Sequence, residues 1–342
     1  MLQLFRNNQF YTVFFVVCYA LILAFNTYLQ PIDNLSAQSD KAGFVLQGLM
    51  QSIQGRLALA LFFILFLTQA LLVNGLVFEF RIVKRNTYIT SVVFILCLFL
   101  FANGDLLSPA LLANFFIILA LSNIYQAYDK KNSVIEVFNA GFFIALGALI
   151  YLPLLWYFIF ILIAWFSLRS FNIKELLILI SALLIPFFLL GTYQYVVGHF
   201  LDWWQSDIIS KLKIGRFSLN QSPAFIISLS MFGLLLIWNV LGIQGLKQKT
   251  TIREQKFINV LYWLLFISVL SLSGQASFFN AEDNGHFALI ALPLGILFSL
   301  NLQALQKNKL ANIFHGLIFL AVIVVQYYAY ILGFILTFLG VS

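Results

Sequence analysis

The feature that most constrains this chain is a series of eleven apolar stretches separated by short polar segments. A transmembrane helix needs about 20 residues to cross the hydrocarbon core of a bilayer, and only helices or closed barrels pair all their backbone polar groups there. The stretches lack the alternation of barrel strands, so they predict an all-α, polytopic transmembrane helix bundle. The predicted spans are 10–29, 57–78, 88–103, 110–127, 137–152, 154–168, 176–198, 223–245, 257–275, 287–305 and 312–338.

The composition supports the same class of protein. Hydrophobic residues make up 62% of the chain and charged residues only 9%, whereas soluble domains carry about 25% charged residues. So few charges exclude a cytosolic enzyme, a secreted domain, a disordered chain and a nucleic-acid binder. We expect one integral-membrane domain over 1–342, with a core of 1–198 followed by helices in 223–342, and membrane lipids as its surroundings.

The basic residues predict which way the chain is threaded. With a cytoplasmic N-terminus and alternating spans, all but five of the 19 Lys and Arg residues fall on the cytoplasmic side. The five on the outer side are Lys41, Arg56, Lys211, Lys213 and Arg216. Cytoplasmic loops carry such an excess, so the pattern predicts an odd number of spans in a bacterial inner membrane. The net charge of +7 is then a signal of topology.

One stretch leaves two arrangements open. Residues 137–168 are divided only by Pro153, and a proline disfavours helix at the residue before it. We interpret the stretch as two short helices joined by a tight turn, which form either two short spans or a re-entrant hairpin.

Two carboxylates in the predicted outer loops are candidate catalytic residues. Asp33 follows the first span, and Asp105 lies in the next outer loop. A carboxylate at such a boundary can act as a general base or bind a divalent cation, which makes a divalent cation a candidate cofactor. The same residues can instead cap a helix or remain solvated loop charges.

A third outer segment combines aromatic and basic residues. Residues 200–214 have the spacing of an amphipathic helix lying in the membrane interface, with tryptophans at headgroup depth. Lys211, Lys213 and Arg216 are candidate ligands for the phosphate of a lipid-linked substrate. The alternative is an anchoring helix with basic residues at its polar edge.

The last outer loop holds a polar cluster of Glu282, Asp283 and His286. These side chains can ligate a metal ion or transfer a proton, whereas the Asp-Asn-Gly order is also ordinary turn chemistry. The chain has no established metal-binding spacing. His315, near the start of the last span, is expected to lie in the cytoplasmic interface.

The whole chain resembles an uncharacterised family of bacterial multi-pass membrane proteins, known only as a domain of unknown function. The resemblance rests on the LeuPheArgAsnAsn opening at 4–8 and on the segments 139–153, 169–176 and 184–186. It implies a multi-pass fold and supplies no mechanism.

The first two-thirds of the chain also resembles the integral-membrane glycosyltransferases of the GT-C type, which use polyprenyl-phosphate sugar donors. The resemblance implies that Asp33 and Asp105 match the two outer-loop acids, and that Lys211, Lys213 or Arg216 contact phosphate. We therefore expect a glycosyltransferase-like enzyme acting on a polyprenyl-phosphate-linked substrate at the outer face. Two alternatives remain: a transporter or flippase for a lipid or small amphiphile, and a non-catalytic scaffold subunit of an envelope complex.

Overall fold

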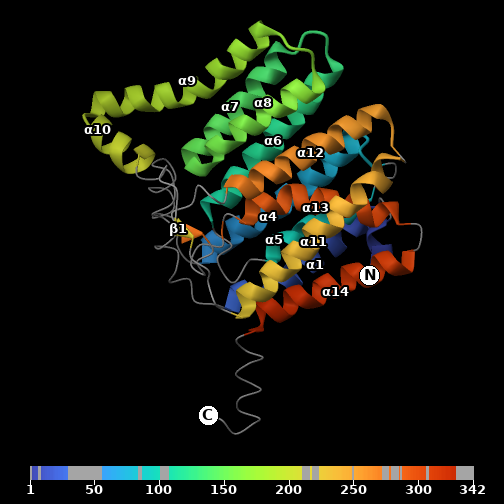
Figure 1. Cartoon of the computed structure of the whole chain (residues 1–342). Coiled ribbons are helices and arrows are strands. Elements are labelled where there is room, and N and C mark those ends of the chain that lie inside the picture. The colour runs from blue at the N-terminus through green and yellow to red at the C-terminus, as the bar shows by residue number, and fades with distance from the viewer. Residues whose placement is uncertain are drawn as a thin grey trace.

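The protein is a helix bundle (Figure 1). The computed structural model describes residues 2–6, 9–29, 56–83, 87–100, 108–209, 216–217, 223–248, 250–271, 277–278, 285, 287–305 and 308–328. Its longer helices are α1 (Phe10–Leu29), α4 (Arg56–Glu79), α5 (Ile89–Phe99), α6 (Pro109–Asp129), α7 (Val134–Ile150), α8 (Trp156–Leu168), α9 (Ile173–Val197), α11 (Pro223–Lys247), α12 (Ile252–Ser271), α13 (Phe287–Ala304) and α14 (Asn308–Gln326). The short helical elements are η1 (Leu2–Arg6), η3 (Leu152–Leu155), α10 (Phe200–Trp203) and η4 (Trp204–Ile209).

The all-α prediction is confirmed, and each of the eleven predicted stretches contains a helix. Six of the described helices are long and apolar enough to cross a membrane: α4, α6, α9, α11, α13 and α14. Helices α5, α7 and α8 are apolar but shorter. The fold therefore has the helices of a multi-pass membrane protein, while the total of eleven spans stays a prediction.

The stretch around Pro153 forms two helices, as expected. Helix α7 ends at Ile150 and α8 begins at Trp156, with the 3-10 turn η3 between them. Pro153 occupies the second position of η3, where its missing N–H group leaves no helical hydrogen bond unmade. The turn sends α8 back along the bundle.

Two helices begin earlier than their apolar runs because polar caps extend them. Helix α12 begins at Ile252, five residues before the predicted span. Thr251 and Glu254 bond to each other's backbone N–H groups, which is the capping box that a Thr-x-x-Glu sequence favours. Helix α9 begins at Ile173 in the same way, with the Asn172 side chain accepting from Lys174 N.

The helix directions alternate along the chain. Contacts spaced along neighbouring helices show that α5 is antiparallel to α4 and α13, that α6 is parallel to α4 and antiparallel to α12, and that α11 is parallel to α13. The contacting pairs are Ala70–Ser91, Phe66–Phe99, Thr90–Ser299, Phe94–Gly295, Gln69–Leu111, Phe80–Tyr125, Asp129–Arg253, Tyr125–Phe257, Phe225–Phe287 and Asn239–Asn301.

The alternation gives the bundle two ends. The first, here called the Arg169 end, holds η1 and the connections α4–α5, α6–α7, α8–α9 and α11–α12. The second, called the Ser108 end, holds the starts of α6, α11 and α13 and the connection between α9 and α10.

Helices α5 and α13 form the centre of the bundle. Every residue of α5 is buried, and so is 89% of the apolar segment Phe287–Ala304 that makes up α13. Gly295 allows the close approach, because a Cβ atom there would lie 2.8 Å from Phe94 Cα. Helix α9 is the opposite case, because only 17% of its most apolar part is buried. It contacts mainly α7 and α10 (Figure 1).

The predicted interfacial helix is helical over its described part. After α9, Gly198 adopts a positive φ of 83° and the chain reverses into α10 and the π-helical turn η4. Trp203 is buried against Gly191, while Leu201 and Trp204 are exposed. Residues 210–214 of the prediction lie outside the described residues.

Candidate functional site

Most residues proposed from the sequence lie outside the described part of the chain. These are Asp33, Asp105, Lys211, Lys213, Glu282, Asp283 and His286. Arg216 is placed by its backbone, in strand β1 (Arg216–Phe217). The described residues that adjoin these positions indicate which segments meet.

Two contacts between distant parts of the chain lie at the Ser108 end. Strand β1 pairs in parallel with β2 (Ser277–Phe278), with Arg216 opposite Ser277. Ser108 Oγ donates to the Gly285 carbonyl at 3.1 Å. Gly285 therefore contacts the start of α6, three residues after Asp105, and β2 pairs with the strand that contains Arg216.

Local chemistry fixes the contact between Ser108 and Gly285. Ser108 is the N-cap of α6, and its hydroxyl accepts from Leu111 N at 3.3 Å while it donates to residue 285. A Cβ atom at Gly285 would lie only 2.3 Å from Ser108 Cβ, so the contact requires glycine. The starts of α11 and α13 also meet, with the rings of Phe225 and Phe287 6.1 Å apart.

A buried amide pair lies just inside this end. Gln69 of α4 donates from Nε2 to the Leu111 carbonyl at 2.7 Å, and Asn114 Nδ2 donates to Gln69 Oε1 at 3.2 Å. Both side chains are fully buried, and Asn114 Oδ1 has no partner. Such bonds between helices contribute about 0.6 kcal/mol each on average. The sequence reasoning did not single out Gln69, since a lone amide in an apolar run carries no distinguishing pattern.

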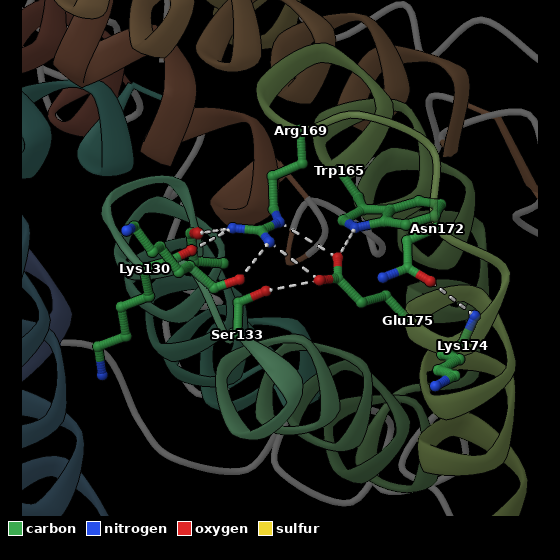
Figure 2. A network of polar contacts seen from close by, with 9 residues as sticks. Lys130, Ser133, Trp165, Arg169, Asn172, Lys174 and Glu175 are labelled. Carbon is green, nitrogen blue, oxygen red and sulfur yellow. Dashed lines mark hydrogen bonds and ion pairs between the residues drawn. The ribbon is translucent and has the colours of Figure 1, made fainter.

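The best defined polar cluster lies at the Arg169 end (Figure 2). Glu175, in the first turn of α9, is buried and accepts four hydrogen bonds: two from Arg169 at 3.0 and 3.2 Å, one from Trp165 at 2.7 Å and one from Ser133 at 3.0 Å. Figure 2 shows the Arg169 guanidinium between this carboxylate and the backbone at the end of α6. There it donates to the carbonyls of Ala127, Lys130 and Lys131.

This cluster fastens two helix hairpins together. Arg169 and Glu175 come from the α8–α9 connection, and their partners Ser133 and the Ala127 carbonyl belong to the α6–α7 hairpin. Two further ion pairs lie at the same end, Lys130–Glu136 and Arg253–Asp129, both at 2.5 Å. Both Glu175 oxygens are occupied, so the arrangement serves structure and leaves no carboxylate oxygen for a substrate.

His315 packs inside the bundle. Its side chain is fully buried between helices, and Nε2 lies 3.3 Å from the Tyr19 hydroxyl of α1. The residue is therefore a packed position two turns inside α14, and its place at the cytoplasmic interface stays a prediction. Among the described residues, no group of three or more His, Cys, Asp or Glu side chains could hold a metal ion.

Comparisons of the chain with protein-family models, curated proteins and solved structures find no match. The fold alone defines the class: a helical bundle in whose described part six helices are long and apolar enough to cross a membrane.

Proposed function

We propose that the chain is a multi-pass protein of the bacterial inner membrane with its Arg169 end in the cytoplasm. Support comes from the basic residues, because cytoplasmic segments carry an excess of Lys and Arg. The described basic residues at the Arg169 end are Arg6, Arg81, Lys130, Lys131, Arg169, Lys174, Lys247, Arg253, Lys256 and Lys309.

At the opposite, outer end, the protein acts as a glycosyltransferase-like enzyme on a polyprenyl-phosphate-linked substrate. Asp33 would be the general base, with Asp105 as the second acid, and Lys211, Lys213 and Arg216 would hold the phosphate. The observation that supports this proposal is that the Ser108–Gly285 bond and the β1–β2 pair lie at the same end of the bundle. Groups from distant segments must come together before they can act on one substrate.

Binding of the lipid carrier is the first test. The full-length protein, purified in detergent, is incubated with a polyprenyl phosphate and examined by native mass spectrometry. The triple variant Lys211→Gln, Lys213→Gln, Arg216→Gln should lose most of the bound lipid, because charge-assisted contacts to phosphate are the strong ones. The matched control removes three positive charges at the other end, with Lys131→Gln, Lys174→Gln and Lys309→Gln, and should bind as the parent does.

Turnover separates a binding protein from an enzyme. Asp33→Asn should retain the carrier lipid and lose consumption of a polyprenyl-phosphate-linked sugar. Equal lipid retention by the two triple variants would refute the phosphate site. Unchanged turnover in Asp33→Asn would refute the base and favour the transporter or scaffold alternatives.

A further inference from the structure

Helices α1 and α14 lie side by side and share two polar contacts along their seam (Figure 1). One is the Tyr19–His315 contact. The other lies towards the Ser108 end, where Asn26 Nδ2 donates to the Gln326 carbonyl at 2.6 Å. All four side chains are buried, so this seam brings polar groups together deep in the bundle.

The seam also concentrates polar atoms that have no hydrogen-bond partner. These are Asn26 Oδ1, Gln326 Oε1 and His315 Nδ1. The other unpartnered atoms among the described residues are scattered over the fold, on Thr87, Asn114, Gln194, Arg253 and Gln303. A buried polar atom without a partner is costly, so the two amide oxygens at the Ser108 end of the seam, Asn26 Oδ1 and Gln326 Oε1, point to a bound group.

The two amide oxygens define the chemistry of that group. Only Nδ2 of Asn26 can donate to the Gln326 carbonyl, which fixes the amide orientation and leaves Oδ1 as a free acceptor. Gln326 Oε1 is a second free acceptor, on the residue to which Asn26 is bonded. Their side chains are 2% and 6% exposed, so bulk water does not supply the missing donors.

The surrounding charge selects between possible cations. Hard cations take oxygen ligands. Among the described residues, neither α1 and α14 nor α5 and α11, which pack against them, contain an Asp or Glu residue, so these helices offer neutral oxygens alone. A site without a carboxylate suits a single positive charge better than a double one.

We propose that Asn26 and Gln326 bind a small monovalent cation, Na⁺ or K⁺, in the seam between α1 and α14. Water or further backbone carbonyls complete its coordination. His315 stands eleven residues before Gln326, about 16 Å along the helix, and is not a ligand. The proposal rests on α1 and α14 and does not depend on the proposed enzymatic function.

Binding of radioactive ²²Na⁺ to the purified full-length protein tests the site directly. A scintillation proximity assay should show saturable binding that unlabelled Na⁺ and K⁺ displace and choline does not. Asn26→Leu should weaken binding at least tenfold. Gln326→Glu should strengthen it, because the charge of the ligands tunes cation affinity. Asn123→Ala is the matched control, since Asn123 bonds only within α6 in the described contacts, to Leu119 O, and it should bind as the parent does.

Each alternative outcome counts against the site. Absence of saturable binding would mean that the free oxygens are met by water alone. Equal binding by Asn26→Leu and the parent would place the ion elsewhere. If Asn26→Leu fails to fold, Gln326→Glu still decides, because unchanged affinity in that variant would exclude Gln326 as a ligand.

Discussion

At the scale of single residues, the Arg169–Glu175 pair should dominate the stability of the Arg169 end. The Arg169 and Glu175 side chains are 16% and 5% exposed, and removing one partner of a buried pair costs about 3–5 kcal/mol. Arg169→Gln should therefore lower the midpoint of thermal unfolding in detergent by at least about 5 °C. The double variant Arg169→Gln, Glu175→Gln should lower the midpoint by less than the two single variants together, because it leaves no buried charge without its partner.

Lys174→Gln provides the control for that measurement. Lys174 is exposed, and its only bond in Figure 2 is from its backbone N–H to Asn172. Its replacement should leave the unfolding midpoint unchanged. Strict additivity of the Arg169 and Glu175 losses would mean that the pair acts as two independent surface groups.

The sequence could not have identified this pair as a pair. Arg169 and Glu175 read as loop charges between two apolar runs, and a charge pattern does not name a partner 42 residues away such as Ser133. The same limit applies to Gln69 and Leu111, which meet through helix packing. By contrast, the Thr251 capping box is local, and its Thr-x-x-Glu pattern would have extended α12 correctly.

At the scale of elements, the crossing of α5 and α13 depends on a single missing side chain. A Cβ atom at Gly295 would lie 2.8 Å from Phe94 Cα and 3.3 Å from its backbone nitrogen. Backbone atoms cannot rotate away, and overpacking of this kind costs about 1–3 kcal/mol. Gly295→Ala should therefore lower the thermal unfolding midpoint.

Gly75→Ala is the matched test of that reasoning. Gly75 lies inside α4, and no atom beyond its own stretch of helix backbone stands within 4 Å of the position that its Cβ would take. Because alanine favours helix over glycine, Gly75→Ala should keep or slightly raise the midpoint. Similar losses in both variants would show that helix flexibility matters more than the contact with α5.

Apolar length predicted the helices well, since it is a property of each stretch alone. The packing of one helix against another is not a property of a single stretch. The central place of α5 and the outer place of α9 could therefore not be derived from their similar apolar composition. The site residues predicted from outer loops lie almost entirely outside the described residues. For them, the structure adds two contacts at the Ser108 end: Ser108 bonds to Gly285, and β1 pairs with β2.

At the scale of the whole molecule, the helix directions alternate between the two ends of the bundle. The side of the membrane on which one end lies therefore predicts the side of every connection at both ends. The two ends can be distinguished by Lys131, exposed at the Arg169 end, and Asp202, exposed in α10 at the Ser108 end. In a background of Cys18→Ser and Cys97→Ser, a membrane-impermeant maleimide added to intact cells should label Asp202→Cys and spare Lys131→Cys. Opening the cells should expose both. Labelling of both in intact cells would contradict the alternation across the membrane. Labelling of Lys131→Cys alone would keep the alternation and reverse the orientation, which would place the Ser108 end in the cytoplasm.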